Sequence, residues 1–326
     1  MRCLRLASWQ SGYMATRPEL AFIVGSPRSG TTWLQMLLLQ HPTIVSVQET
    51  HVFSEWISPL LSTTSRQREA GRNVGLSAIL DHDQMLDMAR SIYGAVIDRA
   101  VDGHPDAGVF VEKTPGHVRF VRSILELYPD AKILHVVRDP RATVASIVAA
   151  SQSWGRSWAP SDVAAAARLW RRSVVAGLEI PQLTSETMAI RYEDLSADGP
   201  AVLLGVLRTL GVASDVEECR SFVAACTPEA LAGGDVQGPS GMRGPVAETA
   251  RRAVADGWRT ELSPAEVRAV EWICRREMEQ LGYEPISDKR TRALSIPLAT
   301  GATKAALRRG LSAATSGLDR LDDRLR

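Results

Sequence analysis

A glycine-rich segment near the start of the chain, GSPRSGTTW over residues 25–33, has residue types that bind phosphate groups. It matches the pattern G-x-x-x-x-G-K-[ST] except at Thr31, which stands where that pattern has lysine. Backbone N–H groups of such a turn bind phosphate at the start of a helix. The lysine that reaches the β- and γ-phosphates of ATP is missing, and Arg28 supplies a cation from within the loop instead. The segment therefore predicts an anion site for a shorter 5′-phosphate arm.

A second segment, RDPRATVAS over residues 138–146, has the residues for another phosphate contact. Arg138 follows an apolar run and offers a planar fork of donors. Pro140 can open a helix, and Ser146 then lies about two turns along it. Both side chains can face one phosphate, so we interpret Arg138 and Ser146 as an anion-binding pair.

Two further segments contain candidates for proton transfer and charge stabilisation. QETHVF has Glu49 and His51 two residues apart, which places them on one face of an extended segment. Either side chain could accept a proton from a hydroxyl group. EKTP contains Lys113, one of four lysines in a chain that otherwise uses arginine, and a salt bridge to a carboxylate is the alternative for it. We assign His117 and His135 to packing or to the surface.

Each of these groups lies at the end of an apolar run that predicts a β-strand. The runs are LAFIVG (20–25), TIVSV (43–47), GVFVEK (108–113), AKILHVVRD (131–139) and TMAIRYED (187–194), with helical patterns between them. Strands that alternate with helices indicate a parallel sheet covered on both faces, and ligands bind beyond the carboxyl ends of such strands. We therefore expect an α/β fold with a P-loop-type central parallel β-sheet flanked by helices.

The two anion motifs together resemble those of the sulfotransferases that use 3′-phosphoadenosine-5′-phosphosulfate (PAPS). PRSGTTW matches the family's loop P-[KR]-[ST]-G-T-T/S, and RDPRATVAS matches R-[ND]-P-x-x-x-x-x-S, which binds the 3′-phosphate in that family. The loop is closer to bacterial, carbohydrate and tyrosylprotein members than to the cytosolic small-molecule branch. The resemblance covers roughly residues 21–283.

This resemblance implies a set of cofactor-binding residues. Tyr192 in IRYEDL corresponds to a tyrosine beside the adenine, and RRAVADGW is a degraded counterpart of the family's R-K-G-x-x-G-D-W clamp, although its arginines could also be exposed on a helix. The implied cofactor-binding residues are Arg28, Ser29, Gly30, Thr31, Thr32, Arg138, Ser146, Tyr192, Arg251 and Arg252.

The resemblance also implies catalytic roles. Tyrosylprotein and carbohydrate members use a carboxylate base, whereas the cytosolic branch uses histidine, so we favour Glu49 as the base and keep His51 as the second candidate. EKTP resembles an E-K-[ST]-P element of glycan sulfotransferases, whose lysine lies near the reacting groups, which implies that role for Lys113. Arg28 would stabilise the charge that develops on the bridging oxygen.

The implied activity is in-line transfer of a sulfuryl group from PAPS to a hydroxyl of a carbohydrate, glycolipid or other small molecule. Adenosine 3′,5′-bisphosphate is the product, and the electrostatics do not require a metal ion. A P-loop kinase in which Asp139 holds Mg²⁺ and a nucleotide-binding module without catalysis are the alternatives. Sugar, glycolipid, peptide tyrosine and small phenol all remain open as acceptors.

The composition limits the partners of the chain. A net charge of +1, from 38 basic and 37 acidic residues among 326, predicts no nucleic-acid partner. The four cysteines have no paired spacing, which indicates neither a zinc site nor disulfides and favours a reducing cytoplasm. No run of about 18 apolar residues occurs, so we expect no transmembrane segment. The predicted location is the cytoplasm, and the motifs favour a bacterial source.

We expect one main domain with additions. The tail at the C-terminus has a leucine stripe with arginines, typical of a docking helix or of membrane-surface contact, and homo-oligomerisation stays open. The start codon is Met1 or Met14. The predicted parts are an N-terminal tail (1–19), the sulfotransferase domain (20–286) with a helical substrate-side insertion over the strand ends (55–107) and a mobile loop (233–245), and a C-terminal helical tail (287–326).

Overall fold

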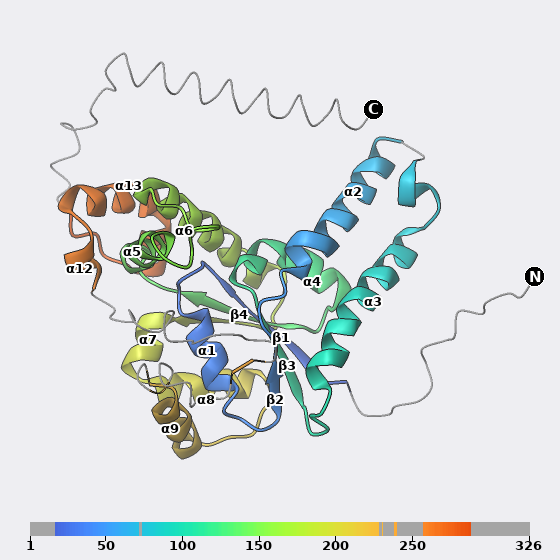
Figure 1. Cartoon of the computed structure of the whole chain (residues 1–326), viewed down its shortest axis with the longest axis horizontal. Helices are drawn as coiled ribbons and strands as arrows, with labels where there is room; N and C mark the ends of the chain where they lie inside the picture. The colour runs from blue at the N-terminus through green and yellow to red at the C-terminus, as the bar shows by residue number, and fades with distance from the viewer. Residues whose placement is uncertain (1–16, 72–73, 228–229, 231–237, 240–256, 288–326) are drawn as a thin grey trace, which may run out of the picture. The chain divides into compact units, whose positions relative to one another are not determined.

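The computed structural model describes residues 17–71, 74–227, 230, 238–239 and 257–287 (Figure 1). The chain divides into two compact units, Met1–Glu284 and Pro285–Arg326. The fold below belongs to the first unit, because only 285–287 of the second are among the described residues.

A five-stranded sheet forms the centre of the first unit, with the strand order β2-β3-β1-β4-β5. Every pair of neighbouring strands is parallel. The sheet consists of β1 (Glu19–Gly25), β2 (Ile44–Ser46), β3 (Val109–Lys113), β4 (Lys132–Val137) and β5 (Thr187–Arg191). The predicted α/β fold with a central parallel sheet is confirmed, and all five strands lie within a few residues of the predicted runs.

Helices cover the sheet because its strands are apolar on both faces. One core cluster joins the strands to α1 (Thr31–Leu38), α8 (Gly199–Thr209) and α9 (Val216–Ala225). Helix α7 (Tyr192–Ala197) lies between β5 and α8 in the chain. A second cluster joins them to α3 (His82–Val101) and α4 (Val121–Leu127). A third surrounds α5 (Pro140–Ser151) and α6 (Val163–Leu178) together with α12 (Trp258–Glu261) and α13 (Pro264–Leu281).

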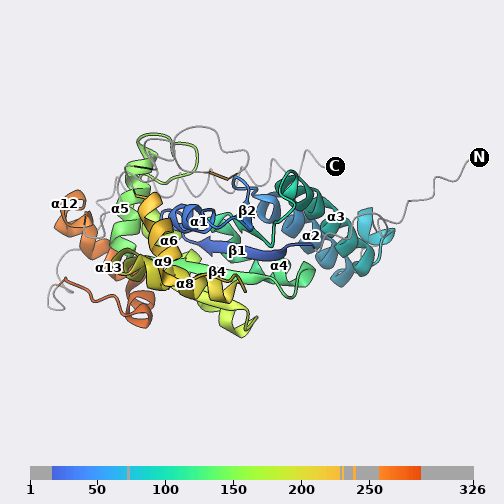
Figure 2. The same ribbon diagram turned by 90° about the horizontal axis from the view of Figure 1, so that it is seen from below.

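The predicted insertion is helical. It contains a π-helical turn (Phe53–Ile57), α2 (Ser58–Glu69), a short 3₁₀ turn (Gly75–Ala78) and α3. Asp81 and Gln84 form a capping box that begins α3 where the sequence predicts a helix. Figures 1 and 2 agree that α2 and α3 lie on the opposite side of the first unit from α12 and α13.

The position of α3 differs from the expected cover over the strand ends. Its residues Met85, Ala89, Tyr93 and Ile97 repeat every four positions and are buried in the second core cluster. The Tyr93 ring stacks on Phe22 of β1 at a centroid distance of 5.8 Å. Helix α3 therefore covers a face of the sheet, because its apolar stripe needs that surface, and a substrate-side role for the insertion stays a prediction.

A buried charged network fastens α13 to the rest of the unit. The Arg141 guanidinium donates to Asp139 (Nη2 to Oδ2, 2.6 Å) and to Glu271 of α13 (Nη1 to Oε1, 2.8 Å). Beside it, the Tyr283 hydroxyl donates to Glu193 at 2.9 Å, and Glu193 also accepts from the Asp139 backbone N–H at 2.9 Å. The network therefore connects the last described helix to the carboxyl ends of β4 and β5.

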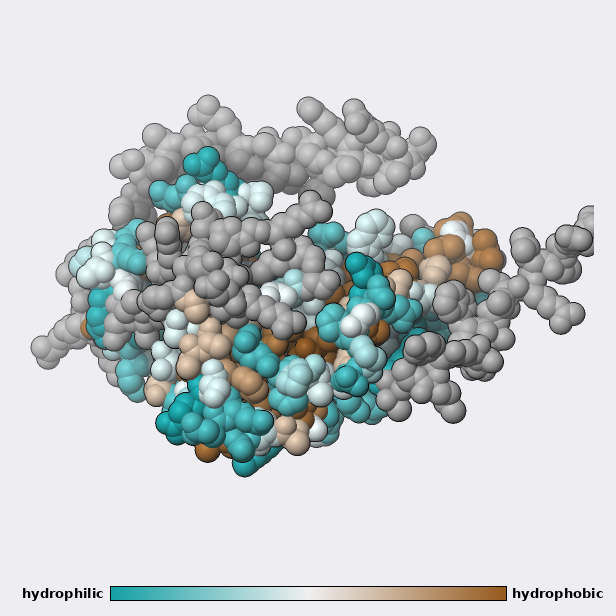
Figure 3. All heavy atoms as spheres, turned by 60° about the horizontal axis from the view of Figure 1, so that its bottom comes forward, coloured by the Kyte–Doolittle hydropathy of each residue, from teal (hydrophilic) through white to brown (hydrophobic). Residues whose placement is uncertain are grey.

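On the face shown in Figure 3, the described residues form hydrophilic areas with hydrophobic patches between them. Large exposed apolar side chains include Trp56, Val74, Leu76, Ile79, Trp154, Trp158 and Trp272. Among the described residues, no helix combines the length and the apolar character needed to cross a bilayer.

Candidate functional site

The loop between β1 and α1 starts the site. The Ser29 hydroxyl donates to the Ser26 carbonyl at 2.8 Å and tightens the turn. Arg28 (φ 70°) and Gly30 (φ 100°) both have left-handed backbones, which is rare for a residue with a side chain. Gly30 occupies the N-cap position of α1, where no side-chain hydrogen bond caps the helix. Free N–H groups at such a helix start are suited to an anion.

Gly30 also lies close to another part of the chain. A Cβ atom added to Gly30 would lie 2.5 Å from Cδ2 of the Tyr192 ring. Gly30→Ala should therefore lower the free energy of unfolding by about 1–3 kcal/mol, from left-handed strain and overpacking. Urea unfolding of the purified protein measures this loss.

Gly94→Ala is the matched control for that substitution. Gly94 lies inside α3, and an added Cβ there would meet nothing within 4 Å. Alanine in a helix interior is favoured over glycine by about 0.5–1 kcal/mol, so this variant should be as stable as the parent or more stable. Equal stability of Gly30→Ala and the parent would contradict the close approach of Tyr192.

Arg28 is held on two sides. Its Nε donates to the Ser146 hydroxyl at 3.0 Å, and its Cζ lies 5.3 Å from the ring centroid of Trp154. Burial and the charge of Arg138 lower the pKa of Arg28 to about 10, while the charge of Glu49 raises it. Arg28 is therefore a cation at neutral pH and interacts electrostatically with Glu49.

Arg138 directly follows β4 and lies beside Arg28. Its Nη1 donates to the Arg28 carbonyl at 3.4 Å, and its Cζ lies 4.2 Å from the Tyr192 ring centroid. Trp170 donates its indole N–H to the Arg138 carbonyl at 3.0 Å. The fold thus gathers two guanidinium groups and Ser146 in a largely buried place, where an anion would offset the repulsion between the like charges.

Tyr192 lies under the loop, with a side chain 3% exposed. Its ring contacts Arg138 and lies 5.7 Å from the Trp33 ring. The structure thus shows Tyr192 supporting the loop and Arg138, and its predicted contact with adenine stays a prediction.

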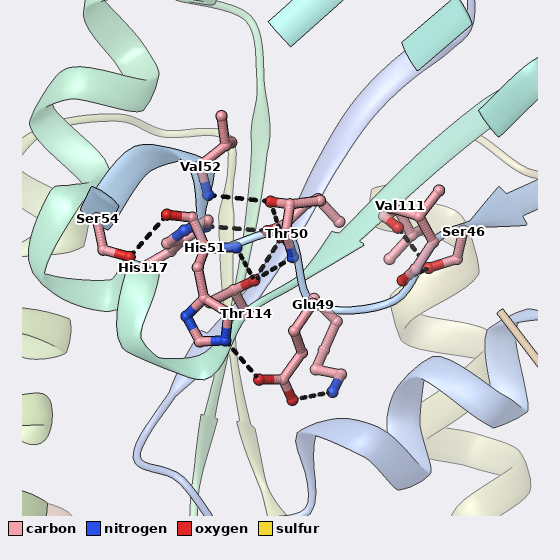
Figure 4. Close-up of polar contacts among 12 residues, drawn as sticks. Ser46, Glu49, Thr50, His51, Val52, Ser54, Val111, Thr114 and His117 are labelled. Carbon is pink, nitrogen blue, oxygen red and sulfur yellow. Dashed lines mark hydrogen bonds and ion pairs between the residues drawn. The ribbon is translucent and has the colours of Figure 1, made fainter. Parts of the chain in front are cut away.

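The second half of the site is centred on Glu49 (Figure 4). The Lys113 ammonium at the end of β3 forms an ion pair with Glu49 Oε1, and His51 Nε2 lies 3.5 Å from Oε2. Burial acts to raise the pKa of Glu49, but the hydrogen bond to His51 and the charge of Lys113 outweigh it and lower the pKa to about 2. Glu49 is therefore a carboxylate at neutral pH.

His51 itself has two unusual properties. Its hydrogen bond to Glu49 raises its pKa above 6.5, against the opposing effect of burial. Its backbone is left-handed, with φ at 52°. The Ser54 hydroxyl donates to the His51 carbonyl at 2.8 Å and helps to hold this turn (Figure 4).

The structure thus brings most of the predicted residues to one edge of the sheet, where all five strands end. Ser29 and Thr31 are buried, and Thr32 is half-buried in the first turn of α1. Arg251, Arg252 and most of the loop 233–245 lie outside the described residues, as do nearly all of the predicted tails.

The two histidines that we assigned to packing or to the surface are both buried. His117 Nδ1 lies 3.0 Å from Glu112 Oε2, so His117 belongs to a buried polar cluster. Burial lowers the pKa of His135 to about 4, and a Cβ on Gly177 would collide with its ring.

Asp139 does not have the geometry of a magnesium ligand. Its carboxylate accepts from the Arg141 backbone N–H at 2.8 Å and caps α5. Both of its oxygens also accept from the Arg141 guanidinium, at 2.6–3.2 Å. Because Arg141 occupies both oxygens, the arrangement disfavours the kinase alternative. Among the residues that the structure describes, no three His, Cys, Asp or Glu side chains gather closely enough to hold a metal ion.

Sequence reasoning missed Trp154 and the polar cluster around Glu112. Trp154 lies in the turn after α5, about two helical turns beyond Ser146, and this spacing could have indicated its contact with Arg28. Glu112 interrupts the apolar run of β3, and a charged residue at such a position indicates a buried network.

Known proteins resemble both the sequence and the fold. Mouse protein-tyrosine sulfotransferase 1 is 30% identical over 131 residues, which cover 40% of this chain and 34% of the mouse protein. Nodulation protein NoeE of Sinorhizobium fredii is 27% identical over 203 residues, covering 55% of this chain and 46% of NoeE. The chain thus spans about a third to a half of these curated relatives.

Among solved structures, the sulfotransferase domain of the Synechococcus PCC 7002 olefin synthase has the same fold. It superimposes with a TM-score of 0.53 and 23% identity, covering 85% of this chain and 99% of that domain. A mouse sulfotransferase, SULT7A1, crystallised with PAP, matches with a TM-score of 0.50 and 15% identity over 80% of this chain and 85% of its own.

The Sulfotransferase family model matches residues 19–216, from the first residue of β1 to the first residue of α9. This segment is well over half of the chain and contains both anion motifs, Glu49 and Lys113. The chain therefore belongs to the sulfotransferase family.

Proposed function

We propose that this protein transfers a sulfuryl group from PAPS to a hydroxyl group of a carbohydrate, glycolipid or other small-molecule acceptor. The observation that carries the proposal is the ion-paired carboxylate of Glu49 at the same sheet edge as the guanidinium groups of Arg28 and Arg138. Two cations beside an ionised base suit the transfer of an anionic group to a hydroxyl.

The donor set of the loop side fits a nucleotide with two separate phosphate groups. The start of α1, which has no side-chain cap, and Arg28 provide donors for the 5′ side. Arg138 and Ser146 provide a fork and a hydroxyl for a 3′-phosphate. As its name states, the SULT7A1 structure contains PAP, which is adenosine 3′,5′-bisphosphate. That complex supports binding of the same bisphosphate here.

PAPS supplies a sulfuryl group on a phosphate leaving group. The side chains of this protein accept the proton of the hydroxyl and stabilise the charge of the leaving group. Glu49 accepts the proton of the acceptor hydroxyl. Its pKa of about 2 makes it a weak base, which suits a loose transition state, since the hydroxyl becomes acidic only as its new bond forms. Arg28 stabilises the charge that grows on the leaving oxygen, and its burial strengthens that effect.

Lys113 links the two sides of the site. Its side chain is 3% exposed, and its ammonium pairs with Glu49. An anionic group bound beside Arg28 would compete with Glu49 for this ammonium, so the pKa of Glu49 would rise when the base is needed. Lys113 thus acts as a cation shared between the carboxylate and the transferred group.

Stabilisation by nucleotides tests the proposal against its alternatives. Adenosine 3′,5′-bisphosphate should raise the melting temperature without Mg²⁺, and at a hundred times its Kd the gain is about 2.7 kcal/mol. Stabilisation by ATP only with Mg²⁺ would support a kinase. Binding of the bisphosphate without turnover of PAPS on sugars, glycolipids, phenols and tyrosine peptides would support a binding module. The tyrosine peptides belong in this set because relatives are named protein-tyrosine sulfotransferases.

Arg138→Ala should weaken the binding of adenosine 3′,5′-bisphosphate by roughly ten- to a hundredfold. Losing one partner of a charge-assisted contact costs about 1.5–3 kcal/mol. Isothermal titration calorimetry measures the change. Arg122→Ala is the control, because Arg122 is a largely exposed arginine paired with Glu179 on another part of the surface. Parental affinity in Arg138→Ala would show that Arg138 does not bind the 3′-phosphate.

A further inference from the structure

A buried carboxylate that the proposed chemistry does not use lies directly behind the site. Glu112 of β3 precedes Lys113 and is fully buried. It accepts from the Thr114 hydroxyl at 2.6 Å and from the Thr50 hydroxyl at 2.9 Å, and His117 Nδ1 lies 3.0 Å from its other oxygen. Burial acts to raise the pKa of Glu112, but the charge of His117 and these hydrogen bonds lower it. Glu112 is therefore an ionised acceptor with several donors.

Two of these donors, Thr50 and Thr114, link Glu112 to the segment that contains the base. Thr50 is part of that segment, and Thr114 contacts it. Thr50 lies between Glu49 and His51, and its backbone N–H donates to the Thr114 hydroxyl at 3.2 Å. The His51 N–H points to the same hydroxyl oxygen at 3.5 Å (Figure 4). Because the Thr114 hydroxyl donates its proton to Glu112, its oxygen is oriented to accept from this backbone.

Neighbouring residues of β3 thus contact neighbouring residues of the base segment. Lys113 binds Glu49, and Glu112 binds Thr50. The left-handed backbone of His51 costs about 1–3 kcal/mol and persists only where surrounding contacts fix it. The hydrogen bonds that the Thr114 hydroxyl accepts from the His51 N–H and the Thr50 hydroxyl accepts from the Val52 N–H are such contacts.

We propose that Glu112 is a positioning residue, which holds Thr50 and Thr114 and through them aims Glu49 and His51 at the acceptor hydroxyl. The assignment rests on the proposed function for its purpose, but the positioning itself can be measured without turnover. A misplacement of about 1 Å in such a group can cost about a hundredfold in rate.

Thr50→Val and Thr50→Ser form a matched pair for the test. Valine has the shape of threonine without the hydroxyl, and serine keeps the hydroxyl, so neither changes the charge near His51. Three carboxylates face His51, namely Glu49, Glu55 and Glu112, and the bond to Glu49 raises its pKa most. If the network positions this segment, Thr50→Val loosens the Glu49 contact, and the pKa of His51 falls toward 6.5.

The readout is the titration of the His51 ring protons by NMR, assigned with a His51→Gln sample. We expect a lower His51 pKa in Thr50→Val and a parental value in Thr50→Ser. Glu112→Gln should lower it as well, in part because it removes a charge that raises this pKa. Calorimetry should give the same affinity for adenosine 3′,5′-bisphosphate within about twofold in all three. A parental His51 pKa in Thr50→Val, or equal shifts in the valine and serine variants, would overturn the proposal.

Turnover gives a separate second result. With PAPS and an acceptor that the parent uses, we expect kcat to fall by about ten- to a hundredfold in Glu112→Gln and by about tenfold in Thr50→Val, with Thr50→Ser near the parent. A parent that neither binds the bisphosphate nor turns over PAPS would disprove the proposed function, while the NMR result would still decide the positioning role. A loss of bisphosphate affinity equal to the loss of kcat would reduce Glu112 to a residue needed only for folding.

Discussion

Glu49→Gln is expected to lower turnover by about 10² to 10⁴ while the affinity for adenosine 3′,5′-bisphosphate holds. Glutamine keeps the shape of the side chain and an acceptor oxygen for Lys113, but it cannot take up the proton of the acceptor hydroxyl. Steady-state kinetics with PAPS and calorimetry with the product measure the two quantities. Glu55→Gln is the control, because Glu55 is an exposed carboxylate near His51 with no assigned role.

The pH dependence distinguishes Glu49 from His51 as the base. In the free enzyme a base with a pKa of about 2 stays ionised throughout the mildly acidic range, so kcat/KM, which reports the free enzyme, should persist well below pH 6. A histidine base whose pKa is raised above 6.5 would lose activity as the pH falls through that value. His51→Ala should cost less than Glu49→Gln. Near-parental turnover in Glu49→Gln, together with loss of activity in His51→Ala, would assign the base to His51.

The same pKa shifts predict how the pair contributes to stability. The lowered pKa of Glu49 means that its ion pair stabilises the folded state fully above about pH 4.5, and the contribution is lost as the pH falls toward 2. The raised pKa of His51 has the opposite sign: its contribution is complete below 6.5 and is lost as the pH rises through the raised value.

Arg28→Ala is expected to lower kcat by about 10² to 10³, and to lower the affinity for adenosine 3′,5′-bisphosphate less. The leaving oxygen gains charge during the reaction, so a cation beside it stabilises the transition state more than the ground state. Kinetics and calorimetry on one preparation compare the two losses.

Arg28→Lys is the informative companion variant. Lysine keeps the positive charge but not the planar fork that donates to Ser146 and lies over Trp154. It should retain part of the bisphosphate affinity and recover only part of the rate. Equal losses of rate and affinity in Arg28→Ala would make Arg28 a simple phosphate anchor.

The strands and the loop could be predicted because their causes are local. An apolar run such as LAFIVG is readable within a few residues, and the glycines of the loop mark the turn before α1. The spacing of Arg138 and Ser146 also predicts that both side chains face the same anion, because the start of one helix, α5, fixes their relative positions. The structure adds that Arg28 is the donor to Ser146, and this contact joins residues 118 positions apart, which no local pattern shows.

The rest of the site depends on packing between distant elements. The four-residue stripe of α3 predicts a helix with one buried face, but a stripe does not specify which surface covers it. Tyr192 provides a similar case. The family resemblance implies a contact with the ligand for this residue. In the structure its ring packs against Gly30 and Arg138, because β5 lies beside β4. Long-range geometry of this kind follows from the whole fold.

The charged network on α13 joins the C-terminal part of the first unit to the segment that follows β4. The family match stops at residue 216, but Arg141, two positions after Asp139, has Glu271 as a buried partner and donates to the Glu284 carbonyl. Removing one partner of a buried ion pair costs about 3–5 kcal/mol, a large share of the 5–15 kcal/mol that stabilises an average domain. The segment that the family model matches is therefore shorter than the unit that this network holds together, and we expect a fragment that ends at residue 216 to be less stable than one that includes Glu284.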